Sequence, residues 1–328
     1  MGDATEDDVA TAFAPATVGN VAVGFDILGF ALASPGDRVE VTRIDESTVR
    51  IAEITGVVTD LPTDATENTA TAGLVELIDD LNLDFGFEVR IEKGIPLGSG
   101  MGGSAASAVA SIVAADSLIN RRLSRPELLH YALLGEAVAT GEIHADNVTP
   151  CLFGGLTLTR SIDPVDIIEI PVPEQIRCAV VYPHRRVDTK RARQAIPDEL
   201  PVAQFVEQSA NLAGFIAGCY RGDLDLIGRS LEDVLIEAHR APLVPGLTAV
   251  RRAADEAGVL GSSISGAGPT VFAWCRSAKS ADLAAQQMAD AFVAEGCDTS
   301  VWTGAISVNG AHLVEGLNRS THFEGQIR

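Results

Sequence analysis

Residues 96–107 read Pro-Leu-Gly-Ser-Gly-Met-Gly-Gly-Ser-Ala-Ala-Ser, and this glycine-rich stretch decides the fold. It follows an alternating segment, residues 87–92, whose pattern predicts a strand. It leads into residues 105–118, an alanine-rich segment without a breaker that predicts a buried helix. A glycine loop between a strand and a helix N-terminus is typical of phosphate binding, because backbone N–H groups and the helix dipole both favour an anion.

Three phosphate-binding patterns compete for this loop. Gly98, Gly100 and Gly103 satisfy G-x-G-x-x-G. That dinucleotide pattern also needs an acidic residue about 20 positions on, at the end of a second strand. Asp116 lies instead in or just after the predicted helix, so this interpretation is rejected. A Walker A loop is excluded as well, since no lysine follows the glycines.

The third pattern is that of the GHMP kinases, which phosphorylate small molecules. Residues 96–105 resemble their signature, Pro-x-Gly-Ser-Gly-x-Gly-Ser-Ser-Ala. The match departs at Gly103, which replaces the first serine of the pair. Ser104 is left to reach a magnesium ion. The alternative is a tight turn without a ligand.

Composition sets the broad class of the protein. The chain has 328 residues, 46% of them hydrophobic, which is enough for two packed domains. No apolar run approaches the ~20 residues of a membrane span. Residues 1–8 are acidic where a signal peptide would be basic. Five scattered cysteines without a CxxC pattern predict reduced thiols, so a cytoplasmic protein is expected (Cys151, Cys178, Cys219, Cys275 and Cys297).

The charge balance excludes two classes of partner. The formal net charge is −21, so nucleic acid and anionic membranes would be repelled. The acid surplus, with only Lys93, Lys190 and Lys279 as lysines, indicates a surface kept soluble in high salt, as in a halophilic protein. One basic island interrupts the acidic chain, and it is interpreted either as a solvated loop or as a receptor for an anionic substrate (Arg185, Arg186, Lys190, Arg191 and Arg193).

The order of predicted elements indicates an α+β fold without repeats. Residues 163–173 carry turn signals and are taken as a linker, which divides the chain into domains at 1–165 and 166–328. Strands are expected at residues 9–13, 38–44, 49–54, 87–91, 154–159, 178–182, 262–265, 271–275, 299–302 and 305–308. Helices are expected at 68–81, 104–119, 125–140, 203–220, 223–239 and 281–295.

A carboxylate on the apolar side of a helix marks a second candidate site. Ser124-Arg-Pro-Glu127 is a capping box that starts this helix, and Gly141 can end it. Glu136 shares a face with Leu129 and Leu133, so it is predicted to be buried. A buried carboxylate needs a partner or a cation. Magnesium held with Ser104 is one interpretation; a salt bridge to an arginine is the one that the helix alone favours.

Three further segments are each interpretable as ordinary turns. Residues 144–147 read His-Ala-Asp-Asn just past Gly141. Residues 15–29 form a glycine-punctuated loop with one Asn and one Asp in an apolar setting. Residues 265–270, Ser-Gly-Ala-Gly-Pro-Thr, form a glycine turn between two predicted strands. Taken singly, none of them identifies a function.

Taken together and in this order, the segments resemble the GHMP kinases, and among these most closely the members that phosphorylate L-homoserine. The resemblance also rests on Thr-Lys-Arg-Ala-Arg at 189–193 and on Arg240 before Pro245-Gly246. It covers nearly the whole chain. At residues 18–22 the chain departs from the Ser-Ala-Asn-Leu-Gly usual in the family and reads Val-Gly-Asn-Val-Ala. The resemblance implies a two-domain fold with an N-terminal domain like ribosomal protein S5 domain 2, a ferredoxin-like C-terminal α/β sandwich, and an active site between them.

The resemblance implies ATP-dependent phosphorylation of the L-homoserine hydroxyl, a step toward threonine. ATP would bind Asn68, near the adenine, and the glycine loop (Pro96, Leu97, Gly98, Ser99, Gly100, Met101, Gly102, Gly103, Ser104, Ala105 and Ala106). Mg²⁺ would bind Ser104 and Glu136. The substrate would bind a polar set from both halves of the chain (Asn20, Asp26, Asp146, Asn147, Thr189, Arg193, Arg240 and Gly266).

These implied roles suit an amino-acid substrate. Asp26, assisted by Asn20, is expected to bind the ammonium. Arg193 and Arg240 are expected to bind the carboxylate, because the guanidinium fork matches two carboxylate oxygens. Asp146 and Asn147 would orient the reacting hydroxyl and the neighbouring amine.

A protein base is not expected. Some relatives place an Asp beside the hydroxyl, where this chain has Asn147, which accepts no proton. Phosphoryl transfer relies mainly on positioning and charge neutralisation, so Ser104, Glu136 and Asn147 are the residues expected to carry catalysis. His144 is interpreted either as an assistant or as a helix-end hydrogen-bonding group.

Two other functions stay open. The chain could phosphorylate another small alcohol, such as shikimate or mevalonate, which would not need both an acid for an ammonium and paired arginines for a carboxylate. It could also be a catalytically silent nucleotide sensor. A homodimer is kept as an option for the assembly.

Overall fold

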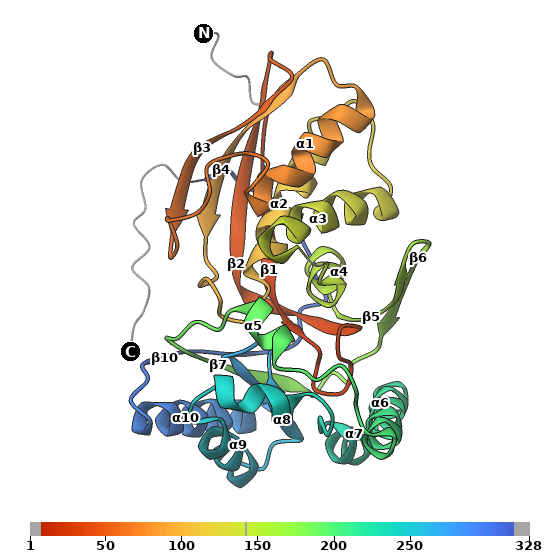
Figure 1. The fold of residues 1–328 in the computed structure, drawn as a ribbon, viewed down its shortest axis with the longest axis vertical. Helices are drawn as coiled ribbons and strands as arrows, with labels where there is room; N and C mark the ends of the chain where they lie inside the picture. The colour runs from red at the N-terminus through yellow and green to blue at the C-terminus, as the bar shows by residue number, and fades with distance from the viewer. Residues whose placement is uncertain (1–7, 142, 318–328) are drawn as a thin grey trace.

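The computed structural model describes residues 8–141 and 143–317, and Figure 1 shows them as two stacked halves, each built on a sheet. The acidic residues 1–7 lie outside this range. The upper half carries a long twisted sheet with helices on one side. The lower half carries a smaller sheet whose far side is covered by helices.

The first sheet has seven strands. Five of them have the order β11-β1-β2-β4-β3, and off this path β5 pairs with β2 and β6 pairs with β5. All pairs are antiparallel except β3 with β4. The strands are β1 Val9–Gly19, β2 Leu28–Ile44, β3 Val49–Gly56, β4 Gly86–Lys93, β5 Leu156–Ile162, β6 Val165–Ile170 and β11 His312–Val314.

Four helices accompany this sheet. They are α1 Thr69–Leu81, α2 Gly103–Asp116, α3 Arg125–Thr140 and α4 Ala145–Phe153. α2 is buried along nearly its whole length, as its alanine-rich sequence predicts. α3 begins with the expected capping box between Ser124 and Glu127 and ends at Gly141, whose φ is 79°.

The second sheet has the strand order β10-β7-β9-β8 and is antiparallel throughout. One strand, a helical segment, two strands, a helix and a last strand follow one another, which is the ferredoxin-like arrangement. The strands are β7 Arg177–Pro183, β8 Gly261–Ile264, β9 Val271–Cys275 and β10 Thr299–Gly304. The helices are α5 Thr189–Gln194, α6 Val202–Arg221, α7 Leu224–Ser230, α8 Glu237–Arg240, the 3₁₀ turn Ala241–Leu243, α9 Leu247–Glu256 and α10 Ala278–Ala294.

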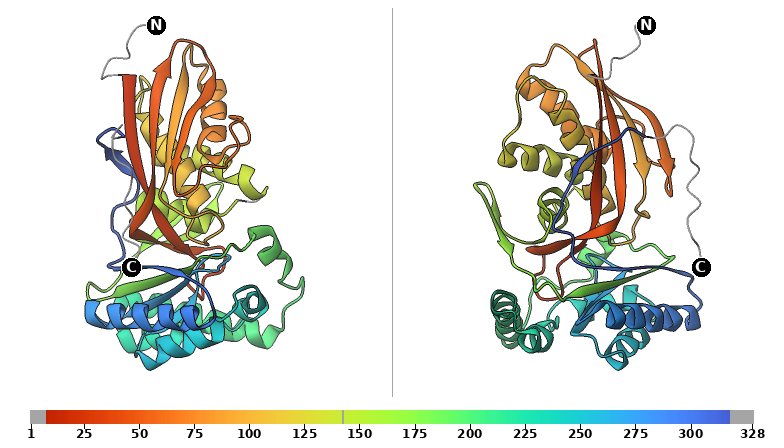
Figure 2. Two further views of the ribbon diagram at one scale, coloured as in Figure 1. Left: turned by 90° about the vertical axis from the view of Figure 1, so that its left-hand side faces the viewer. Right: turned by 180° about the vertical axis from the view of Figure 1, so that it is seen from behind.

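β9 joins the two halves because alternate side chains point to opposite faces. Val271, Ala273 and Cys275 pack among the buried residues of α9 and α10. Phe272 and Trp274 point the other way, and their rings lie 5.7 and 5.8 Å from the ring of Phe30 on β2. Figure 2 shows α9 and α10 on the side of this sheet that faces away from the first half. The two halves therefore share one apolar core.

The α+β class is confirmed, and several element predictions are wrong. Residues 165–170 form β6 and pair with β5, although turn residues flank them. Residues 305–308 make one isolated bridge, Leu32 to Ile306, in place of a strand. The helix expected at 223–239 is interrupted, because the Asp233 carboxylate accepts hydrogen bonds from the N–H groups of Leu235, Ile236 and Glu237 and starts a new turn there.

The proposed domain boundary between residues 165 and 166 stays a prediction. The first sheet continues to Ile170 and takes a further strand from 312–314. Within the described ranges, no helix is long and apolar enough to cross a membrane. All five cysteines are free and buried, as the absence of a CxxC pattern predicts.

Candidate active site

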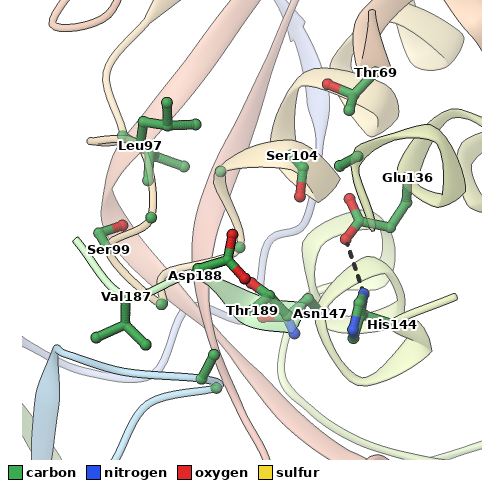
Figure 3. Close-up of a pocket in the computed structure, with 18 of the residues that line it drawn as sticks. Thr69, Leu97, Ser99, Ser104, Glu136, His144, Asn147, Val187, Asp188 and Thr189 are labelled. Atoms are coloured by element: carbon green, nitrogen blue, oxygen red, sulfur yellow. Dashed lines mark ion pairs between the residues drawn. The ribbon is translucent and has the colours of Figure 1, made fainter. Parts of the chain in front are cut away.

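A cavity of about 750 Å³ lies at the junction of the two halves. Its walls come from the loop after β1, the glycine loop, α3, the start of α4, and the segment that leads into α5. Figure 3 shows residues from the glycine loop, α3, the start of α4 and the segment before α5 around this space (Leu97, Ser99, Ser104, Glu136, His144, Val187, Asp188 and Thr189). The cavity thus brings together segments that are far apart in the sequence.

The glycine loop forms one wall and adopts a conformation that needs glycine. Gly98, Gly100 and Gly102 have φ values of 63°, 78° and 66°. A Cβ on Gly100 would lie 2.5 Å from the carbonyl oxygen of Ser265, so the two halves also approach too closely there for any side chain. Gly102 is the N-cap of α2 and offers no side chain to the first N–H groups of that helix, whose first residues, Gly103 and Ser104, line the cavity.

Most of the residues predicted for nucleotide binding line the cavity. Eight of the eleven loop residues do so, as does Asn68 (Pro96, Leu97, Gly98, Ser99, Gly100, Gly102, Gly103 and Ser104). Met101, Ala105 and Ala106 do not: they are fully buried behind the loop, where Met101 accepts a backbone hydrogen bond from Thr17. Their side chains therefore shape the loop, and their predicted contact with the nucleotide stays a prediction.

Asn68 also has a structural role as a helix cap, which was not predicted from the sequence. It is the N-cap of α1, and its Oδ1 accepts a hydrogen bond from the Ala70 N–H at 2.9 Å. Its Nδ2 donates to the Pro62 carbonyl at 2.7 Å. Pro62 also lines the cavity, so Asn68 fixes this wall.

A buried ion pair holds the base of the glycine loop. The Lys93 ammonium pairs with the Asp37 carboxylate and donates to the Gly103 carbonyl at 2.7 Å. The other Asp37 oxygen accepts from the N–H groups of Gly94 and Ile95 at 3.0 and 3.1 Å. One pair therefore fixes both the end of β4 and the start of α2. Sequence reasoning missed it, although the scarcity of lysine singled out Lys93.

Glu136 is buried as predicted, and its partner is a histidine where an arginine had been considered. Its Oε1 lies 3.4 Å from His144 Nδ1, an ion pair drawn in Figure 3. This contact raises the pKa of His144, which favours the charged imidazolium. The other oxygen, Glu136 Oε2, is buried and has no hydrogen-bond partner among the described residues. An unsatisfied carboxylate oxygen that borders a cavity fits a cation ligand.

Ser104 stands opposite this carboxylate at the start of α2. In Figure 3 its hydroxyl and the Glu136 carboxylate point into the same space, from α2 and α3 respectively. No cluster of three or more His, Cys, Asp or Glu side chains suited to a metal occurs in the part of the chain that the structure describes. A magnesium site with few protein ligands, completed by phosphates and water, fits this pair.

Asp146 and Asn147 lie at the start of α4, close to the end of β1. Asp146 Oδ2 accepts a hydrogen bond from the Asn20 N–H at 3.2 Å, and Thr17 donates to Asn147 Oδ1 at 2.9 Å. Burial, and then the charge of Asp26, raises the pKa of Asp146 to about 6. A Cβ on Gly19 would lie 2.4 Å from Asp146 Oδ2, so β1 passes this carboxylate without a side chain between them.

One part of the cavity, called the substrate end here, carries the predicted substrate charges and is formed by Asn20, Asp26, Arg193 and Arg240. Arg193 on α5 forms a bidentate pair with Asp26, with distances of 2.7 and 3.1 Å. Asn20 Oδ1 accepts a hydrogen bond from the Asp26 N–H at 3.0 Å and so fixes the backbone of Asp26. Arg240 is buried and donates to the Gly266 carbonyl at 2.9 Å. The prediction that these residues lie together is consistent with this geometry, and their roles toward a substrate stay predictions.

The loop that presents Asp26 has an unusual backbone. Asn20, Val21 and Ala22 are consecutive residues with φ values of 68°, 46° and 56°. A β-branched valine at positive φ is a strained outlier. The side chains of Val21 and Ala22 are buried, which offsets part of that cost. The sequence placed a loop here, and the structure adds that residues 15–19 still belong to β1.

Residues 265–270 form the turn on which both ends of the site meet. The Gly266 carbonyl accepts from Asn20 Nδ2 at 2.9 Å as well as from Arg240. Ser265 Oγ donates to the Gly100 carbonyl at 2.7 Å. Gly266 and Thr189 both line the cavity. This glycine turn therefore connects the glycine loop with the substrate end.

Comparison with known proteins identifies the arrangement. The family models for the GHMP kinases N terminal domain and the GHMP kinases C terminal match residues 68–155 and 215–294. Homoserine kinase of Xylella fastidiosa (strain 9a5c) is 48% identical over 308 residues, which covers 93% of this chain and 94% of that protein. The chain belongs to the GHMP kinase family. The cavity lies where the two matched regions meet.

Solved structures of GHMP kinases share the whole architecture. A crystal structure of homoserine kinase from Cytophaga hutchinsonii ATCC 33406 has a TM-score of 0.91 and 40% identity, covering 96% of this chain and all of that one. Lactococcus lactis galactokinase, in complex with galactose, is 15% identical with a TM-score of 0.70 and shares the fold. The predicted two-domain GHMP kinase fold is confirmed. The chain is therefore an ATP-dependent kinase.

Proposed function

We propose that this GHMP kinase transfers the γ-phosphoryl group of ATP to the hydroxyl of L-homoserine. The name homoserine kinase, carried by relatives at 48% and 40% identity over most of the chain, supports this substrate. The observation that carries the proposal is the charge layout of the cavity. The cavity is lined by the glycine loop and also by one acid and two guanidinium groups, those of Asp26, Arg193 and Arg240.

The charges fit a zwitterion with a short side chain. L-Homoserine presents an ammonium, a carboxylate and a hydroxyl. Asp26 suits the ammonium, and Arg193 with Arg240 suits the carboxylate. Mevalonate and shikimate carry a carboxylate but no ammonium, and galactose carries neither. Asp26 is therefore the group that favours an amino acid over the other substrates of the fold.

We assign magnesium binding to Ser104 and Glu136. The unpartnered Glu136 Oε2 supports this assignment, because a buried carboxylate oxygen without a donor is costly unless a cation meets it. Magnesium bound there would neutralise phosphate charge during transfer. His144 keeps the other Glu136 oxygen oriented.

The chemistry proposed needs no protein base. The substrate hydroxyl oxygen attacks the γ-phosphorus, the bond to the β–γ bridging oxygen breaks, and ADP leaves. The contact with Glu136 raises the pKa of His144 and so favours the imidazolium form. An imidazolium already carries both ring protons and accepts no further proton. Asn147 accepts none. The hydroxyl proton therefore leaves to a phosphate oxygen, and the backbone donors of the loop and α2 stabilise the charge in transfer.

Product analysis tests this function. The protein with ATP, Mg²⁺ and L-homoserine should give O-phospho-L-homoserine, detected as a phosphomonoester by ³¹P NMR and by mass. Omission of homoserine should leave only slow ATP hydrolysis. Formation of ADP and inorganic phosphate alone, with homoserine present, would refute the proposal and support a nucleotide sensor.

A further inference from the structure

Phe25 lies behind the substrate end of the cavity and in contact with both of its arginines. The central guanidinium carbon of Arg193 lies 5.0 Å from the centre of the Phe25 ring, and that of Arg240 also lies 5.0 Å away. Both distances fall within the ~6 Å range of a cation–π interaction. Phe25 itself is half-buried and is not one of the residues that line the cavity. One ring therefore supports two cations that come from different helices.

The two arginines need such a support because they repel each other. Burial, and then the positive charge of Arg193, lowers the pKa of Arg240. Arg193 has Asp26 as a counter-ion. Arg240 is only 5% exposed and forms no ion pair with any described carboxylate. Its side chain donates hydrogen bonds to the carbonyls of Ala192 and Gly266, at 3.4 and 2.9 Å. The carboxylates of Asp26, Asp146 and Asp233 act in the opposite direction on the pKa of Arg240. The electron-rich ring face adds negative potential in direct contact with both guanidinium groups.

The ring is held by the same loop that presents Asp26. Gly24 donates its N–H to the Asn20 carbonyl at 2.8 Å, and Asp26 donates its N–H to Asn20 Oδ1 at 3.0 Å. Leu28 closes the turn with a hydrogen bond to the Gly24 carbonyl at 2.8 Å. The position of the ring is thus fixed relative to Asp26. A group that places both arginines also sets their distance from the carboxylate that suits an ammonium.

We infer that Phe25 is a positioning residue that holds Arg193 and Arg240 together as one receptor for the substrate carboxylate. This inference rests on the proposed function, since it concerns how an amino-acid substrate is recognised. Because Phe25 does not line the cavity, no contact with the nucleotide or the hydroxyl is expected. Reducing the negative potential of its ring face should therefore raise the KM for L-homoserine and leave the KM for ATP and kcat almost unchanged.

Fluorination of the ring tests the electrostatic part directly. Phenylalanine at position 25 is replaced by its mono-, di- and trifluorinated forms, which keep the shape and weaken the negative ring face. The KM for L-homoserine should rise stepwise with each fluorine. Phe25→Leu, which removes the ring, should raise it about 5- to 30-fold, as expected for the loss of two cation–π contacts, and Phe25→Tyr should restore it. Phe153→Leu is the matched control, because Phe153 carries Arg125 at 4.2 Å outside the cavity.

Calorimetric binding of L-homoserine to the same proteins separates the two claims. Wild-type protein that neither binds nor phosphorylates L-homoserine overturns the proposed function, and the substrate role of Phe25 with it. Wild-type protein that binds L-homoserine, with no change across the fluorinated series, overturns the inference alone. An equal rise in the KM for ATP would also overturn it, because that would show a general disturbance of the site.

Discussion

Asp26 and Arg193 form a bidentate ion pair, with N–O distances of 2.7 and 3.1 Å, between the loop after β1 and helix α5. The two residues are 167 positions apart in the sequence. Each is assigned to the opposite charge of a zwitterionic substrate. Before the substrate binds, each residue therefore neutralises the charge of the other. When an amino acid binds, its ammonium can pair with Asp26 and its carboxylate with Arg193, so neither residue loses an ionic partner. A ligand with a single charge would leave one of them without its partner.

Arg193→Ala should raise the KM for L-homoserine about 10- to 100-fold, because hydrogen bonds to charged groups contribute roughly 1.5–3 kcal/mol each. The KM for ATP should change little. The rise in the KM for L-homoserine is limited because Asp26, no longer paired with Arg193, can still bind the ammonium. Steady-state kinetics with each substrate varied in turn measures both constants. Arg191→Ala is the control, since this neighbour on α5 is exposed and does not line the cavity. A larger effect on ATP than on homoserine would show that Arg193 serves the nucleotide.

Glu136→Gln and Ser104→Ala should each lower kcat by two or more orders of magnitude, and the double variant should lose far less than the product of the two losses. Two ligands of one ion act as a unit, so removing the second costs little once the first is gone. Titration of activity with Mg²⁺ should show a raised requirement in both single variants. Glu127→Gln is the control, because Glu127 lies on the same helix outside the cavity and glutamine can keep the capping box. Independent, multiplicative losses would argue against a shared ion.

Asp146→Asn should stabilise the protein at neutral and higher pH. An aspartate in the unfolded chain ionises near pH 3.9, and burial raises the pKa of Asp146 to about 6. The folded state therefore binds this proton more tightly, so the free energy of unfolding falls as pH rises from about 4 to about 6 and stays lower above that range. Asparagine carries no such penalty. The gain should be on the order of 2–3 kcal/mol at pH 8 and clearly smaller at pH 5.

Urea unfolding at the two pH values measures that gain. Asp166→Asn, which removes an exposed carboxylate paired with Arg160, should change the free energy of unfolding little at either pH. A gain for Asp146→Asn that is absent, or as large at pH 5 as at pH 8, would mean that the carboxyl group is not destabilised by burial.

The net charge of −21 predicts that the folded state becomes more stable as salt screens the repulsion between surface carboxylates. The thermal midpoint should rise between low and molar KCl, with most of the rise below about 1 M, where the Debye length has already fallen to about 3 Å. Differential scanning calorimetry at fixed pH follows it. A thermal midpoint that stays constant or falls with KCl concentration would contradict the interpretation that the acidic composition suits high salt.

Local patterns predicted the parts of the site that depend on neighbours in the sequence. The glycine loop, the capping box at Ser124 and the buried side of α3 that carries Glu136 all follow from spacing within a few residues. The physical reason is that backbone dihedral preference and helical periodicity are local properties. β6 was missed because its six residues lie between turn signals, and its strand pairing with β5 decides its structure.

Apart from the substrate set that the family resemblance implied, contacts between distant segments could not be predicted. Lys93 and Asp37 are 56 positions apart, and nothing near either residue indicates the other. The same holds for Phe25 beneath two arginines, and for His144 as the partner of Glu136. The left-handed backbone at Val21 and Ala22 contradicts the local preference of both residues and is imposed by the packing around them. The functional site is thus mostly made of interactions that exist only in the folded chain.

A coupled ADP-release assay across four alcohols tests the central claim most directly. With saturating ATP and Mg²⁺, kcat/KM is measured for L-homoserine, shikimate, mevalonate and galactose. The charge layout around Asp26, Arg193 and Arg240 predicts that L-homoserine exceeds each of the others by at least two orders of magnitude, since each lacks the ammonium that Asp26 is placed to bind. A higher kcat/KM for any of the other three alcohols would contradict the account.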